Sequence, residues 1–256
     1  MVNVPYSQGN GTPVSATWSE RYDLGDRERV WSEMLAAGPG LRNDPVRWRD
    51  AEAVAAATMR RVRVNIELLV ARLQAVGYDF DPSPLSRPFE PPAADIVDQL
   101  ARVEAVTGPI PLAMRAFVEH VGGVCLVGDW PESGFAYTDA LVVTWSADYF
   151  LAEHADWVAE QGTEWARPVF TLDFAPDWLH KANVSGGGPY ALAVPDGAVD
   201  GLVVDEEFGL TFVGHLRRAF QWAGFPGWAR AEPDWAVPAG PPPVELAQWV
   251  TELVPI

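Results

Sequence analysis

The apolar residues follow a helical rhythm through most of the first half of the chain. The pattern is clearest from Pro45 to Val76, where apolar side chains recur every three or four residues along one face. Asn43-Asp44-Pro45 provides an N-cap, with proline just inside the predicted helix. Further helices are predicted within residues 18–37, 93–107 and 112–121, each ended by glycine, proline or both.

From residue 124 the apolar runs become short, which is typical of buried strands. Between 168 and 174 they alternate with polar residues, the two-residue period of a half-covered strand. Alternating βαβ units are absent, so we predict an α+β fold: a mainly antiparallel sheet flanked by helices, with an N-terminal helical extension. Strands are predicted at 124–127, 140–145, 168–174, 190–194 and 201–204, with 210–212 a further candidate, and helices at 148–161, 213–223 and 246–253.

Proline-rich stretches divide the chain into five predicted parts. Dense proline keeps a backbone extended and blocks helix formation, so the main boundary is placed in the proline-rich segment after the first helices. The predicted parts are a polar lead (1–17), a helical extension (18–78), a linker (79–92), an α+β domain (93–230) and a proline-rich tail with a short helix (231–256).

Composition favours a cytoplasmic protein. The only cysteine, Cys125, lies in an apolar run and is predicted to be a buried structural residue in a reducing compartment. The N-terminus lacks the basic and apolar regions of a secretory signal. No window approaches 18 uninterrupted apolar residues, so no membrane span is predicted.

The charge is unevenly placed. The chain carries a net charge of −17, and residues 1–75 hold ten arginines against nine acids. The rest therefore carries the whole excess of acid. Such a field repels nucleic acid and favours basic partners, although acidic surfaces also serve solubility alone. The arginines between 60 and 72 are interpreted as a solvated face or as members of ion pairs.

No residue pattern predicts a catalytic, metal or cofactor site. The four histidines, at 120, 154, 180 and 215, have no metal-ligand spacing. Ser185-Gly186-Gly187-Gly188 lacks the following Lys-Ser or Lys-Thr and the helix of a phosphate-binding loop. We interpret it as a hairpin or bulged turn with positive φ angles. An enzyme alternative stays open: a hydrolase or transferase with a site near Asn183 to Tyr190.

Two stretches resemble a known family. Residues 110–123, IPLAMRAFVEHVGG, resemble the entry motif of the SUKH superfamily, in which an apolar-proline step opens a helix that ends in a glycine pair before an aliphatic strand. Residues 212–228 are similar to the closing helix of some bacterial members. The resemblance spans roughly residues 93–230.

The resemblance implies a non-enzymatic role. Many bacterial members look like immunity proteins that bind and neutralise a polymorphic toxin, often a nuclease, and an acidic surface would suit a basic toxin. A regulatory scaffold that uses the N-terminal helices is a further alternative. The candidate partner contacts are the residues of two acidic loops and one aromatic anchor: Asp129, Trp130, Glu132, Asp196, Asp200, Asp205, Glu206 and Glu207.

Overall fold

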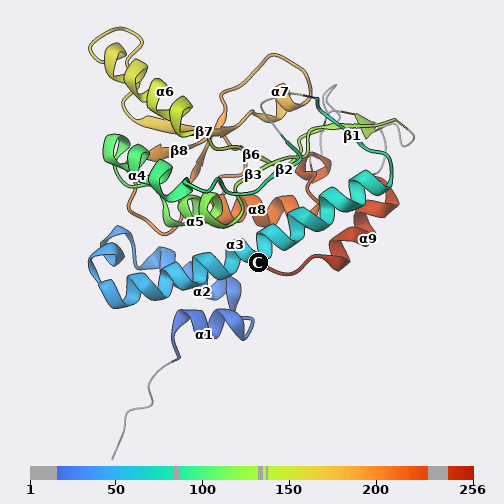
Figure 1. The fold of residues 1–256 in the computed structure, drawn as a ribbon, viewed down its shortest axis with the longest axis horizontal. Helices are drawn as coiled ribbons and strands as arrows, with labels where there is room; N and C mark the ends of the chain where they lie inside the picture. The colour runs from blue at the N-terminus through green and yellow to red at the C-terminus, as the bar shows by residue number, and fades with distance from the viewer. Residues whose placement is uncertain (1–15, 83–86, 132–134, 137, 230–241) are drawn as a thin grey trace, which may run out of the picture.

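The computed structural model describes residues 16–82, 87–131, 135–136, 138–229 and 242–256. Its helices surround small antiparallel sheets, which confirms the predicted α+β class (Figure 1). The helices are α1 (Trp18–Asp23), α2 (Arg27–Ala36), α3 (Pro45–Ala75), α4 (Ile96–Thr107), α5 (Leu112–His120), α6 (Ala147–Glu160), α7 (Trp178–Lys181), α8 (Phe212–Gln221) and α9 (Val244–Glu252), with 3-10 turns η1 (Pro39–Asn43) and η3 (Pro226–Ala229). The strands are β1 (Asp79–Phe80), β2 (Phe89–Glu90), β3 (Gly123–Cys125), β4 (Gly128–Trp130), β5 (Phe135–Ala136), β6 (Val142–Val143), β7 (Phe170–Ala175), β8 (Tyr190–Val194) and β9 (Val203–Val204).

The long helix α3 forms as its sequence predicts and crosses the molecule (Figure 1). The Asp44 carboxylate accepts hydrogen bonds from the backbone N–H groups of Val46 and Arg47, at 3.2 and 3.1 Å, which satisfies two of the free donors at the helix start. The helix predicted within 18–37 forms as α2, and a second, short helix, α1, precedes it. Gly25, with a φ of +107°, separates α1 from α2 in a conformation that residues with a side chain rarely adopt.

The predicted linker is instead part of the folded body. Its first strand, β1, pairs with β4, and β2 pairs with β3, both antiparallel. Phe80 and Phe89 are partly buried and pack against the main hydrophobic core. A linker is therefore the wrong description of residues 79–82 and 87–92, because strand pairing uses the extended backbone that proline favours. The division of the chain into five parts stays a prediction.

The sheet is divided into three, each with three strands. The orders are β1-β4-β5, β2-β3-β6 and β7-β8-β9, and every pairing is antiparallel. The last two sheets meet where the backbone N–H of Thr144 donates to the carbonyl of Phe174, at 2.8 Å. In β7, Phe170, Leu172 and Phe174 are buried while Thr171 and Asp173 are half-buried, which confirms the alternation predicted for this strand.

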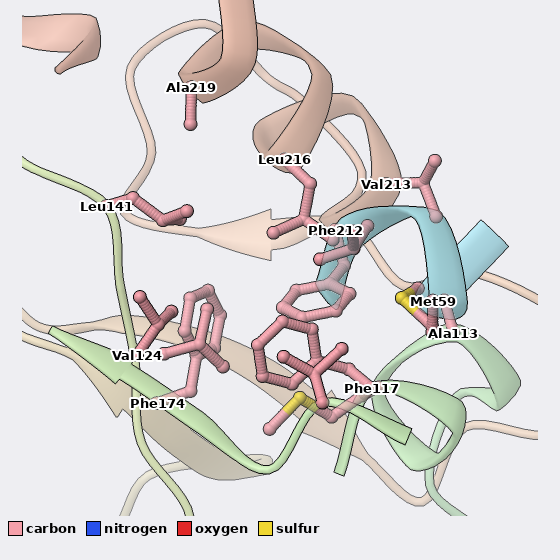
Figure 2. Close-up of a cluster of buried hydrophobic side chains, with 14 of the residues drawn as sticks. Met59, Ala113, Phe117, Val124, Leu141, Phe174, Phe212, Val213, Leu216 and Ala219 are labelled. Atoms are coloured by element: carbon pink, nitrogen blue, oxygen red, sulfur yellow. The ribbon is translucent and has the colours of Figure 1, made fainter. Parts of the chain in front are cut away.

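The centre of the core is aromatic (Figure 2). The Phe212 ring packs edge-on against Phe117 of α5 and Phe174 of β7, with ring centroids 5.6 and 5.4 Å apart. Such edge-to-face pairs contribute about 0.5–1.5 kcal/mol beyond the area they bury. Cys125 is buried nearby in β3, as predicted. The core thus joins the helical first half of the chain to the strands of the second.

The first glycine of the pair after α5 is required by close packing. Gly122 has a φ of +92°, and a Cβ atom there would overlap the carbonyl oxygen of Glu90. Any side chain at this position would force β2 away from β3. The aliphatic strand predicted after the glycines forms as β3.

The last described segment is tied to α3. The Asn65 side chain exchanges two hydrogen bonds with the backbone of Val254, at 2.9 and 2.8 Å, and Trp249 of α9 stacks on Trp130. The predicted terminal helix is confirmed as α9. None of the helices in the described ranges is long and apolar enough to cross a membrane.

Candidate protein-binding surface

Helix α6 is the least buried of the long helices. Ser146 caps it by accepting a hydrogen bond from the backbone N–H of Tyr149, as the sequence predicts. Of its 14 residues only Ala147 and Phe150 are buried. It lies at the outer edge of the molecule, where it packs against α4 and β7 (Figure 1). A helix so exposed gains little stability from packing.

Two aromatic side chains fix α6 to the sheet beneath it. The rings of His154 and Trp157 lie 4.9 and 5.9 Å from the ring of Phe170 in β7. The Nε1–H of Trp157 also donates to the carbonyl of Arg167, at 2.9 Å. The inner side of the helix therefore packs on the sheet, and the residues of its outer side are not needed for this packing.

The loop that follows α6 is held in one shape and presents a tryptophan. The Gln161 amide donates to the same Arg167 carbonyl, at 3.2 Å, and the backbone N–H of Trp165 donates to the Thr163 hydroxyl, also at 3.2 Å. The Trp165 side chain is nevertheless 72% exposed. A tryptophan side chain has few rotatable bonds, so it loses little conformational entropy when a partner covers it, and tryptophan is enriched at binding hot spots.

The surroundings of Trp165 combine apolar and acidic side chains. Between residues 147 and 166 there is no Lys or Arg. Asp148 pairs with Arg102 of α4, whereas the other four acids form no ion pair within the described part of the chain. We define the α6 surface as three exposed apolar residues and these four acids: Tyr149, Trp165, Val169, Glu153, Asp156, Glu160 and Glu164.

The structure moves two of the predicted partner contacts into the interior. Trp130 is 6% exposed and stacks on Trp249, with ring centroids 6.1 Å apart and planes 10° from parallel. Asp200 is also buried, and its carboxylate accepts the backbone N–H of Val213 at the start of α8. Trp130 as a surface anchor and Asp200 as a surface contact are therefore wrong, because packing and helix capping already use both. Glu132 lies outside the described residues.

The remaining predicted contacts lie on separate segments. Asp196 and Glu206 accept local backbone N–H groups, from Ala198 at 2.9 Å and Phe208 at 2.8 Å, so they stabilise turns. Asp205 and Glu207 are exposed after β9, and Asp129 is half-buried in β4. These five residues are spread over β4, the β8–β9 connection and the β9–α8 connection. The sequence did hold a signal for α6, because acids recur from 148 to 164 without a Lys or Arg, with Trp157 on the helix and Trp165 after it.

The enzyme alternative places a site near Asn183 to Tyr190, and this segment follows a lysine that forms a buried ion pair. The Nζ of Lys181, the only lysine in the chain, lies 2.8 Å from the Oδ1 of Asp139, and the Lys181 side chain is fully buried. The glycines at 186–188 do not have the positive φ predicted for them. They are instead needed for close approach, since a Cβ on Gly187 would overlap the Asp177 carboxylate. A lysine enclosed in this way has no direct path to a substrate.

One exposed histidine lies beside this segment. The Asp177 carboxylate caps α7 and lies 2.8 Å from the Nδ1 of His180, whose side chain is 49% exposed. This is a local contact between residues three apart, and it orders a helix of one turn. In the part of the chain that the structure describes, no three His, Cys, Asp or Glu side chains are grouped to hold a metal ion.

Comparison with known proteins indicates no function for this chain. The chain matches no protein-family model, and neither a curated protein nor a solved structure resembles it at a significant level.

Proposed function

We propose that this chain is a non-enzymatic protein that binds a basic protein partner through the α6 surface. The observation that carries the proposal is the exposed Trp165, whose backbone is held by its loop, close in sequence to Glu160 and Glu164, which form no ion pair among the described residues. An aromatic anchor with an acidic rim complements a partner that offers an apolar pocket among basic residues. The indole face would also attract a partner arginine or lysine.

The net charge of −17 adds to this surface. Long-range attraction raises the rate of encounter with a basic partner, and salt lowers that rate by screening. Val169 and Tyr149 are exposed, and removal of their apolar area from water on binding supplies affinity that salt does not weaken. The proposed interface thus has a salt-sensitive association rate and a tryptophan-dependent dissociation rate.

A finer proposal concerns the partner's identity. The SUKH-like segment around α5 and the acidic second half support an immunity protein that acts in the cytoplasm and neutralises a basic polymorphic toxin, possible targets being nucleases. Tight binding alone would block such a toxin, so no catalytic group is needed. Lys181 and Asp139 form the one buried ion pair among the described side chains, and this pair has a structural role.

The test begins with affinity capture from host lysate at low and high salt, with identification of the retained proteins. A basic protein is expected at low salt, and its purified form should bind at least about tenfold more weakly to Trp165→Ala. The double variant Glu160→Gln/Glu164→Gln should mainly slow association. Growth rescue on co-expression with that protein would then support the immunity role.

A matched control separates this surface from the acids predicted after β9. Asp205→Asn/Glu207→Gln removes the same number of charges at another exposed site, and we expect it to leave affinity nearly unchanged. Equal losses from both double variants would show that only net charge matters. An unchanged affinity of Trp165→Ala would overturn the α6 surface, and retention of no basic protein at either salt would overturn the binding function itself.

A further inference from the structure

The short helix α7 carries its one lysine into the interior. Lys181 ends the helix, pairs with Asp139 and lies under the Tyr190 ring of β8, 4.6 Å from its centroid. The pair joins residues 42 positions apart and fastens α7 to the segment before β6. The Gly-rich loop that follows α7 is largely exposed at 185–187. The ion pair of Lys181 with Asp139 therefore anchors α7 to the body.

A second titratable group shares this enclosure. His215, on α8, is 3% exposed, and its ring lies 5.6 Å from the Tyr190 ring and 6.0 Å from the Phe174 ring. Its Nε2 is buried and has no hydrogen-bond partner among the described residues. A neutral imidazole tolerates this place, but an imidazolium there would lack both water and an acceptor at Nε2.

The charges that face His215 make protonation still more costly. Burial is the main cause that lowers the pKa of His215, to about 4, and the Lys181 ammonium lowers it further. Asp139 opposes this shift but is already paired with Lys181, and Arg218 on the same helix adds to the lowering. Tyr190 contributes an uncharged ring. Protonation would thus place a second cation beside one carboxylate.

We propose that Lys181, Asp139 and His215 form an acid-sensitive latch that holds residues 177–189 against the body near neutral pH and releases them when His215 is protonated. Release is easier for α7 than for α8, since α7 has one turn and buries one residue, whereas α8 buries six. Lys181 and His215 contact the same Tyr190 ring, so release of α7 withdraws the Lys181 ammonium from this ring and removes its repulsion of a protonated His215.

The direction of the pH effect follows from proton linkage. In the open form His215 regains its ordinary pKa of about 6.5, so the open form binds more protons than the closed form between pH 6.5 and about 4. The opening equilibrium constant should increase about tenfold for each unit of pH lowered in that window. Asp200 cannot produce this response, because burial raises its pKa to about 7 and protonation then favours the closed, folded form.

Hydrogen exchange followed by mass spectrometry on the full chain tests the latch without any partner. After correction for intrinsic exchange rates, peptides covering 177–189 should open about tenfold more per pH unit from 6.5 to 5, while peptides from α3 and α5 keep their protection. His215→Phe, which keeps an aromatic ring beside Phe174, should abolish the slope. The control His180→Gln should retain it.

Two results would overturn the latch: exchange of 177–189 that does not depend on pH in the unaltered protein, or a slope that survives in His215→Phe. If that variant fails to fold, carbon NMR of histidine ring signals in the unaltered protein decides the question. His215 should titrate well below its ordinary range, and a midpoint near 6.5 in the folded protein would refute the proposal.

Discussion

Helices α6 and α8 differ in the fraction of their residues that is buried in the core. α8 buries six of its ten residues, including Phe212 and Leu216 at the centre of the core. α6 is longer and buries two. Packing therefore explains the side chains of α8. It does not explain Trp165, which follows α6, or the unpaired carboxylates of the α6 surface. Exposed apolar side chains and neighbouring like charges do not stabilise the fold. Their presence on a surface therefore calls for a functional explanation.

The largest effect is expected from a truncation in α8. Phe212→Ala removes a ring that contacts both Phe117 and Phe174, and it should lower the free energy of unfolding by about 4 kcal/mol. Urea denaturation followed by tryptophan fluorescence measures the loss. A cost below about 1 kcal/mol would mean that α8 is not the packing centre that the comparison requires.

Removal of the buried lysine should come next. Lys181→Met leaves the Asp139 carboxylate without its cation, at an expected cost of about 3 kcal/mol near neutral pH. Denaturant unfolding near pH 7 measures the loss. A variant as stable as the unaltered protein would contradict the assignment of the pair as a source of stability.

The start of α8 gives a pH dependence of the opposite sign to that of His215. Burial raises the pKa of Asp200 to about 7, so its folded form holds a proton that the unfolded chain has already lost. Stability from this group is complete below pH 3.8 and falls as pH rises towards 7. Asp200→Asn should gain about 2 kcal/mol relative to the unaltered protein between pH 5 and pH 8.

Thermal or denaturant unfolding of the two proteins across this range gives that difference. The contribution of His215 is common to both and cancels. A difference that does not change with pH would show that Asp200 is ionised throughout.

The smallest effect on stability is expected at the α6 surface. Trp165→Ala should change the free energy of unfolding by less than about 0.5 kcal/mol, because the side chain is mostly exposed. The same change should weaken partner binding at least about tenfold. Calorimetric melting beside a binding titration checks both halves. A destabilisation above 1 kcal/mol would make Trp165 a structural residue and remove the contrast with α8.

Much of the fold could be read from local patterns. The N-cap and apolar stripe of α3, the Ser146 cap of α6 and the alternation of β7 each depend on neighbours within a few residues. The same reasoning failed where a distant partner decides the outcome. The extended backbone at 79–92 looks like a linker until β3 and β4 supply hydrogen-bond partners about 35–50 residues away.

For the α6 surface, too, some features follow from the sequence and others depend on the assembled fold. A helix rich in acids and tryptophan is visible in the sequence, but whether its outer face is covered depends on the rest of the fold. Trp130 shows the opposite result: it follows an acidic residue in a predicted loop, yet Trp249 covers it. Burial is a property of the assembled chain, so composition could not separate Trp130 from Trp165.

The sequence by itself determined the α+β class, the long helix α3 and the strong acidity of the second half, because these follow from short-range periodicity and simple charge counting. Only the tertiary structure decided that Lys181 meets Asp139 beside His215 and that Trp165 stays in water. The physical reason is that burial and pairing are set by segments that lie far apart in the chain and are brought together by the shared core.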